Sequence, residues 1–170
     1  MNLPMFDDLL NIAEIASVFL GFTVLVTALN PSRVDMVRIM GVVIGSSLTI
    51  VLCLLPILLR TYSDDIGFVV RVSSAVWIVL NLSATVAMAR LIPGFSEVQR
   101  EDKIGAAIVW LLEGTMYLTL ILSALLIWPH LSVAFYFAAV FALVLQVIYF
   151  FINLTLSISN SESTTSNSEA

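Results

Sequence analysis

Long apolar stretches alternate with short polar breaks along most of the chain. Each stretch has about 20 to 25 residues, enough for an α-helix to cross a hydrocarbon core roughly 30 Å thick. The stretches cover residues 9–30, 37–59, 67–89, 104–128 and 131–153. This pattern predicts an all-α membrane protein, with a bundle of five transmembrane helices within residues 1–154.

Turn-forming and helix-ending residues make up the breaks. The first three breaks are residues 30–33, residues 60–65 and a longer segment that contains Pro93-Gly94. The fourth is only Pro129-His130, so we expect the last two helices to form a tight antiparallel hairpin. Residues 155–170 are mostly Ser, Thr and Asn, and we predict that they form a disordered cytoplasmic tail.

The positions of Lys and Arg predict the orientation of the bundle. Five basic residues flank the first and third connections: Arg33, Arg38, Arg90, Arg100 and Lys103. The second connection has only Arg60, and the fourth has none. Because cytoplasmic connections are enriched in basic residues, we expect the N-terminus outside and the C-terminus in the cytoplasm. The first eight residues contain two acids and no base, so we interpret the first helix as a retained span and not as a signal peptide.

Composition supports the membrane assignment and narrows the classes of function. Hydrophobic residues make up 60% of the 170 residues and charged residues 11%, which is far more apolar than a soluble domain. The net charge of −5 gives no basic surface for nucleic acid. Cys53 is the only cysteine and His130 the only histidine, so we expect no disulfide, metal site or cofactor. Hydrolase and phosphate-binding motifs are absent from the sequence, and we do not expect an enzyme.

Glu14 and Arg71 are ionisable residues within the predicted first and third helices. A charge at membrane depth costs about 2.5–3.5 kcal/mol on insertion scales, so each group needs a partner or water. Counted from the predicted outer ends of their helices, the two residues lie at similar depth. We therefore predict an outer ion pair, which would either shape a vestibule or gate or serve as a structural bridge.

Glu113 lies near the middle of the predicted fourth helix, with no base at comparable depth. The polar residues at similar depth are neutral: Asn81 on the third helix, Gln146 on the fifth, and Ser46, Ser47 and Thr49 on the second. Tyr117 shares the face of Glu113 at i+4 spacing, and Asn81 follows Arg71 along one stripe of its helix. Glu113, Asn81, Tyr117 and Gln146 are thus candidates for an ion or proton pathway. The alternative is a purely structural layer of interhelical hydrogen bonds.

Small residues mark surfaces where helices approach closely. Gly41 and Gly45 form a Gly-xxx-Gly pair on the second helix, and Gly21 follows Ser17 on the first, in line with Glu14. We expect these faces to pack against other helices. The pattern does not distinguish a neighbour in the same chain from one in another copy.

Residues 12–25, with the sequence IAEIASVFLGFTVL, resemble the first helix of a set of small bacterial multi-span membrane proteins of unknown function. Glu14, Gly21 and Phe22 carry the resemblance, which covers about a tenth of the chain. It implies a bacterial inner-membrane origin and no particular activity.

Two functional hypotheses follow from these features. In the first, the chain is an oligomeric channel or transporter-like protein that conducts a small ion or proton past Glu113. An odd number of spans does not divide into two equal repeats, so several copies would have to provide a symmetric pathway. In the alternative, the chain is a non-transporting sensor or scaffold subunit in the lipid bilayer, which acts through a cytoplasmic protein partner.

Overall fold

The structure is a computed structural model that describes residues 4–27, 33–91, 103–125 and 127–166. Within these ranges, five helices are long and apolar enough to cross a membrane. They are α1 (Pro4–Thr27), α2 (Arg33–Arg60), α3 (Ile66–Leu91), α5 (Lys103–Leu125) and α6 (Ser132–Ser166). A short 3₁₀ helix, η1 (Pro129–Leu131), precedes α6. The predicted fold class, an all-α protein with five membrane-spanning helices, is confirmed, and the chain is a multi-pass membrane protein.

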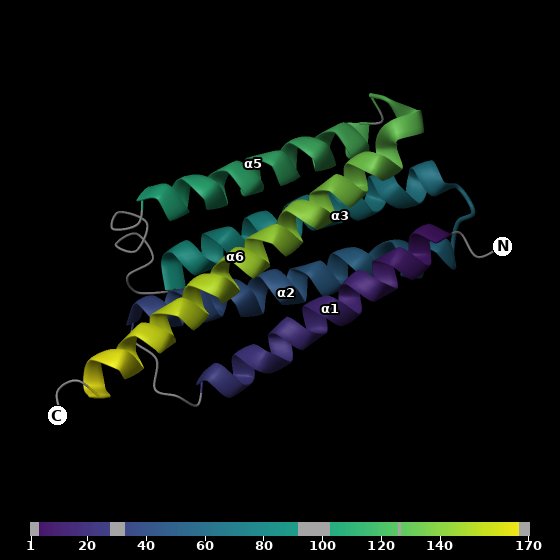
Figure 1. Cartoon of the computed structure of the whole chain (residues 1–170). Coiled ribbons are helices and arrows are strands. Elements are labelled where there is room, and N and C mark those ends of the chain that lie inside the picture. The colour runs from purple at the N-terminus through teal and green to yellow at the C-terminus, as the bar shows by residue number, and fades with distance from the viewer. Residues whose placement is uncertain (1–3, 28–32, 92–102, 126, 167–170) are drawn as a thin grey trace.

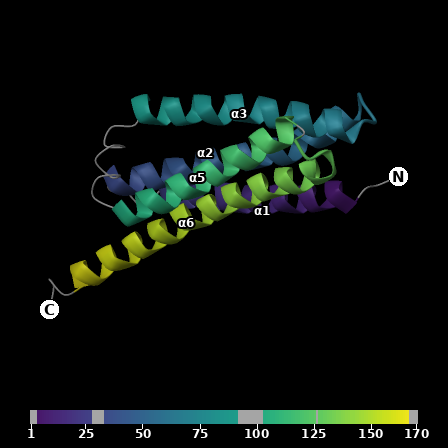
Figure 2. The ribbon, with the colours of Figure 1, turned by 90° about the horizontal axis from the view of Figure 1, so that it is seen from above.

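The helices run antiparallel to their neighbours in sequence and form one elongated bundle (Figure 1). We call the end where α1, α3 and α6 begin the N-terminal end, and the end where α2 and α5 begin the C-terminal end. Helix α2 packs against α1, α3 and α6, whereas α5 packs against α3 and α6. In both views α2 lies between α1 and α3 (Figures 1 and 2). Helices α1 and α3 therefore lie on opposite sides of the bundle.

Two helix starts follow from local sequence. Helix α1 begins at Pro4, five residues before the predicted apolar stretch, because proline fits the first helical position, where no backbone N–H is needed. Helix α3 begins at Ile66, and the Asp65 carboxylate accepts hydrogen bonds from the backbone N–H groups of Gly67, at 2.9 Å, and Phe68, at 3.3 Å. This capping satisfies donors that have no partner inside the helix.

Helices α5 and α6 form the expected tight hairpin around η1. The Ser123 hydroxyl donates to the Ser132 carbonyl at 3.0 Å, and the Ser132 hydroxyl donates to the Pro129 carbonyl at 2.9 Å. The two helices then pack against each other (Figure 1). The short turn thus fixes the position of α5 beside α6.

Helix α6 continues well past the predicted end of the fifth span. It reaches Ser166, so residues 155–166 are helical where a disordered tail was predicted, while residues 167–170 lie outside the described part. Residues 132–166 contain no Gly or Pro, and extending an existing helix costs much less than starting one. The end of α6 projects beyond the other helices (Figures 1 and 2).

Large apolar side chains fill the half of the bundle near the N-terminal end, which we call the packed half. Its buried cluster takes residues from all five helices: Leu9, Ala13, Leu52, Cys53, Val70, Trp77, Met116, Leu120, Tyr136, Ala139, Val140, Ala142 and Leu143. Trp77 and Tyr136 are its largest fully buried members. The cluster closes the space between the helices in this half by direct side-chain contact.

Pro56 removes one backbone hydrogen bond from α2, and Tyr136 on α6 replaces it. Proline has no backbone N–H, so the carbonyl four residues earlier, that of Leu52, loses its usual helical donor. The Tyr136 hydroxyl on α6 donates a hydrogen bond to this carbonyl at 2.5 Å. An unpaired carbonyl is costly inside a membrane, so this bond stabilises the contact between α2 and α6.

Gly41 and Gly45 lie where α2 meets α6. A Cβ atom added at Gly41 would lie 3.0 Å from the Phe150 ring, and one at Gly45 would lie 2.7 Å from Val147 Cγ2. Gly21 differs, because a Cβ atom there would meet nothing within 4 Å. The Gly-xxx-Gly pair therefore serves a contact within the chain, whereas Gly21 faces outward.

Candidate functional site: a polar layer beside an intramembrane cavity

Asn81, Glu113 and Tyr117 form a hydrogen-bonded group between α3 and α5. The Asn81 side-chain amide donates to Glu113 Oε1 at 2.6 Å and to the Tyr117 hydroxyl oxygen at 2.9 Å. Only 7% of Glu113 and 4% of Asn81 is exposed. The structure thus brings together three of the four predicted pathway residues through direct contacts.

Gln146 and Thr85 complete the environment of the Glu113 carboxyl group. Both side chains are hydrogen-bonding partners of this group, as is Tyr117. The partners come from three helices, since Thr85 belongs to α3 and Gln146 to α6. All of them are neutral, and none of the ion pairs found in the described residues includes Glu113. We call Asn81, Thr85, Glu113, Tyr117 and Gln146 the polar layer.

One atom of the polar layer has an unfilled hydrogen-bonding capacity. Gln146 Oε1 is buried and has no hydrogen-bond partner in the described part of the chain. Buried amide oxygens are normally paired, because leaving one unpaired costs about 1–3 kcal/mol. This oxygen adds an acceptor beside the Glu113 carboxyl group. The layer therefore offers oxygen atoms that suit a proton donor or a small cation.

A cavity of about 130 Å³ lies next to the polar layer, toward the C-terminal end. Helices α2, α3, α5 and α6 all contribute to its wall, which is mainly apolar. The polar residues of the wall are Arg38, Asn81, Thr85, Trp110, Glu113, Gln146, Tyr149 and Asn153. We call this part of the bundle the hollow half. Glu113 thus lies in the wall of an intramembrane cavity and is not enclosed by packed side chains.

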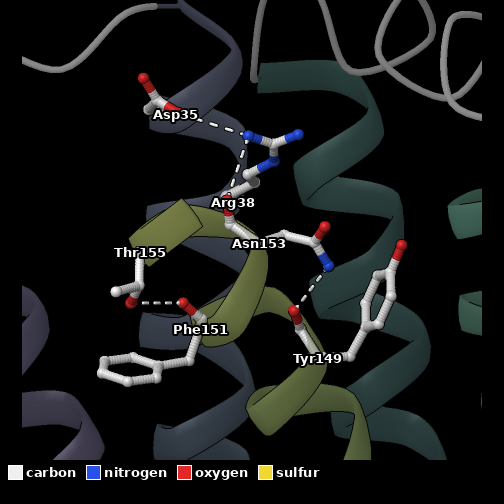
Figure 3. A network of polar contacts seen from close by, with 6 residues as sticks. All are labelled: Asp35, Arg38, Tyr149, Phe151, Asn153 and Thr155. Carbon is white, nitrogen blue, oxygen red and sulfur yellow. Dashed lines mark hydrogen bonds and ion pairs between the residues drawn. The ribbon is translucent and has the colours of Figure 1, made fainter. Parts of the chain in front are cut away.

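Arg38 lies in the cavity wall near the start of α2, on the side away from the polar layer. Its Nη1 donates to the Asp35 carboxylate on its own helix and to the Asn153 carbonyl on α6, each at 3.4 Å (Figure 3). The Asn153 side-chain amide donates to the Tyr149 carbonyl at 2.8 Å. These contacts hold the guanidinium group at the C-terminal end of the cavity. Its positive charge is partly balanced by Asp35.

The polar residues of α2 do not join the layer as expected. Ser46 is buried, but its hydroxyl has no hydrogen-bond partner in the described part of the chain. Ser47 is exposed, and the Thr49 hydroxyl donates to the Gly45 carbonyl of its own helix at 2.8 Å. Thr49 points into the α2 backbone because a helical Ser or Thr can bond to the carbonyl four residues earlier.

Glu14 and Arg71 do not form the predicted ion pair. Both side chains are exposed, and the ion pairs seen among the described residues join Arg38 to Asp35 and Arg60 to Asp64. The physical reason is the arrangement of the helices, since α2 lies between α1 and α3 (Figure 2). Glu14 is also deeper than expected, because α1 begins at Pro4.

Comparisons with known proteins do not assign a function to the site. No family model matches the chain, and neither the curated proteins nor the solved structures include a significant match. The fold class stands on the five long apolar helices. The polar layer and the cavity define the strongest candidate site within the described part of this membrane protein.

Sequence reasoning overlooked two features of the site. Thr85 lies one helical turn after Asn81 on the same stripe of α3, and this spacing of four is the sequence signal that links it to Glu113. Arg38 was used only to predict orientation. Its position five residues inside α2, beyond Asp35, indicates a charge that reaches into the bundle.

Proposed function

We propose that this chain is a transporter-like membrane protein, working as a homo-oligomer, that binds a proton or a small monovalent cation at Glu113. The observation that carries the proposal is the Glu113 carboxyl group, held by neutral partners in the wall of an intramembrane cavity. Ionisable groups within membrane spans are costly and typically mark proton or ion pathways. A purely structural layer would need neither the carboxyl group nor the cavity.

Charge balance favours a singly charged substrate. Glu113 is the only acid of the polar layer, and the other members supply amide and hydroxyl groups. One carboxylate neutralises one positive charge, whereas a divalent cation would leave an uncompensated charge in a low-dielectric site. The Gln146 oxygen, which has no partner in the described residues, adds a ligand atom for the bound species.

The two halves of the bundle favour alternating access over an open pore. In the orientation predicted from the basic residues, the hollow half faces the cytoplasm and the packed half faces outside. Toward the outside, the next polar atoms on α3 are Trp77 Nε1 and the Ser74 hydroxyl, both buried without a hydrogen-bond partner in the described chain. Separation of the helices around Trp77 would connect these atoms with the outer solution.

Flux in liposomes tests this function directly. Proton, Na⁺ and K⁺ fluxes are measured for purified wild-type protein, Glu113→Gln and Thr115→Val. Thr115 is a matched control, because it lies on the exposed side of α5 and its hydroxyl donates to the Leu111 carbonyl of its own helix. We expect flux in the wild type and in Thr115→Val, and only the leak of protein-free liposomes in Glu113→Gln. Equal flux through a folded Glu113→Gln variant would overturn the proposal.

One observation favours the alternative of a sensor or scaffold subunit. Helix α6 extends to Ser166 and projects beyond the ends of the other helices, which is where this function needs a contact with a cytoplasmic partner (Figure 2). The same assay separates the two functions. Absence of flux in the wild type, across pH and membrane voltage, would favour the sensor or scaffold.

A further inference from the structure

Glu14 and Arg71 are ionisable and lie inside candidate membrane spans, and nothing in the described part of their own chain pairs with their charge. Glu14 lies in the span Met5–Leu25 and Arg71 in the span Ile66–Arg90. Both side chains are exposed, and no hydrogen bond or ion pair of the described residues includes either of them. Within a bilayer an exposed side chain at such a position faces lipid or a neighbouring protein, and a charge facing lipid is costly, up to about 2.5–3.5 kcal/mol at the centre of a span on insertion scales.

The remaining described bases do not share this situation. Arg60, Arg90 and Lys103 lie at helix ends, where long side chains reach the polar interface. Arg38 contacts Asp35 and Asn153. Arg71 is thus the exposed base that lies inside a span and needs an acidic partner. The exposed acids Asp7 and Asp8 lie in the first turns of α1, near the polar interface, whereas Glu14 lies deeper in the span, on the opposite side of the bundle from Arg71.

The outward face of α1 has further features of a helix contact surface. Asn11, Glu14, Ser17 and Gly21 are all exposed and recur at spacings of three or four residues, which places them along one stripe that borders the buried Ala13 and Ala16. A Cβ atom at Gly21 would meet nothing within 4 Å. Small and polar residues are typical of helix interfaces in membranes, whereas lipid-facing stripes are apolar.

The outward face of α3 is a suitable partner for this stripe. Arg71 and Ala75 are exposed one helical turn apart on this face, so a base lies next to a small side chain. Glu14 lies ten residues after the start of α1 and Arg71 five residues after the start of α3. This is an offset of about 7.5 Å along parallel helices. Because helical side chains lean toward the N-terminus of their own helix, the Glu14 side chain points back toward the level of Arg71, and the long side chain of Arg71 covers the remaining offset.

We propose that Glu14 of one copy pairs with Arg71 of a neighbouring copy, with α1 of the first chain packed against α3 of the second. The two faces are different surfaces on opposite sides of α2 (Figure 2). The contact is therefore heterologous, so copies inserted in the same orientation assemble head to tail and form a ring where the rotation between copies closes. Each interface removes one acid and one base from lipid, so neither charge is left unbalanced. This assembly does not depend on what Glu113 binds.

Charge reversal tests the pairing in the full-length chain. Glu14→Arg and Arg71→Glu are made singly, together in one chain, and as two single variants expressed together, and the mass of each assembly is measured in lipid nanodiscs. We expect oligomers for the wild type and for the double variant, and monomers for each single variant. Co-expression should restore oligomers, because alternating copies present opposite charges at every interface. A monomeric wild type, or unchanged oligomers in Arg71→Glu, would overturn the proposal.

Crosslinking covers the case in which charge-reversed chains fail to insert. In a Cys53→Ala background, Glu14→Cys and Arg71→Cys are placed in differently tagged copies and treated with a short bifunctional thiol reagent. Leu118→Cys on α5 replaces Arg71→Cys as the control, because it is exposed and lies in the same half of the bundle. We expect Glu14→Cys and Arg71→Cys to give mixed-tag dimers in a much higher yield than Glu14→Cys and Leu118→Cys. Equal yields would overturn the proposal.

Discussion

The packed and hollow halves share the same helices but fill the space between them in opposite ways. In the packed half, Trp77, Met116, Leu120 and Tyr136 are fully or almost fully buried and meet in one cluster. In the hollow half, the small residues Ala84, Gly105 and Ala106 line the cavity. Small side chains at these positions leave space between the helices. The same helices thus form one closely packed half and one half with a cavity.

Buried polar groups also have different roles in the two halves. In the packed half, the Tyr136 hydroxyl bonds to the Leu52 carbonyl, which Pro56 deprives of its helical donor. This polar group compensates for a defect in the backbone. In the hollow half, the hydrogen-bonding partners of the Glu113 carboxyl group come from α3, α5 and α6. The cavity lies beside this group and the unpaired Gln146 oxygen of the described residues. The first arrangement stabilises the fold, and the second is suited to binding.

The largest expected structural effect comes from a larger side chain at Gly45, where α2 approaches α6 closely. Gly45→Leu should destabilise the bundle by about 1–3 kcal/mol, since a Cβ atom there already lies 2.7 Å from Val147 Cγ2. Gly114→Leu is the matched control, because a Cβ atom at Gly114 meets nothing within 4 Å. Thermal unfolding of both variants in detergent measures the difference. Equal stability of the two variants would show that α2 and α6 do not approach as closely as described.

A smaller effect should follow from removing the Tyr136 hydroxyl in the packed half. Tyr136→Phe should cost about 1 kcal/mol, because it leaves the Leu52 carbonyl without a donor in a buried membrane site. Pro56→Ala restores a backbone N–H to α2, so Tyr136→Phe should cost less in that background. Unfolding free energies of the wild type, both single variants and the double variant give the coupling. A coupling near zero would contradict the proposed role of Tyr136.

The lengths of the apolar stretches were sufficient to predict the class of fold. Five apolar stretches long enough to span a bilayer became five helices, and the short Pro129-His130 break became the turn of a tight hairpin. The prediction for residues 155–166 was wrong, since α6 continues to Ser166. Composition favoured disorder there, but the absence of Gly and Pro lets a helix that has already formed continue.

The site was predictable only where depth along a helix determines proximity. Asn81, Glu113, Tyr117 and Gln146 were grouped by depth, and the structure places them in one layer. Depth alone does not say which helices are neighbours, so Glu14 and Arg71 were paired across α2, which separates them. The cavity and the place of Arg38 in its wall depend on side-chain volumes at four helices, which no single stretch of sequence shows.

Water access to the two halves is the most direct test of the central claim that Glu113 lies beside an accessible cavity. In a Cys53→Ala background, Ala84→Cys places a thiol in the cavity wall and Ala139→Cys places one in the fully buried cluster. A membrane-impermeant thiol reagent is then added to each side of the membrane in turn. We predict labelling of Ala84→Cys from the side of the C-terminal end and no labelling of Ala139→Cys. Equal labelling of the two thiols, or none at Ala84→Cys, would contradict the account.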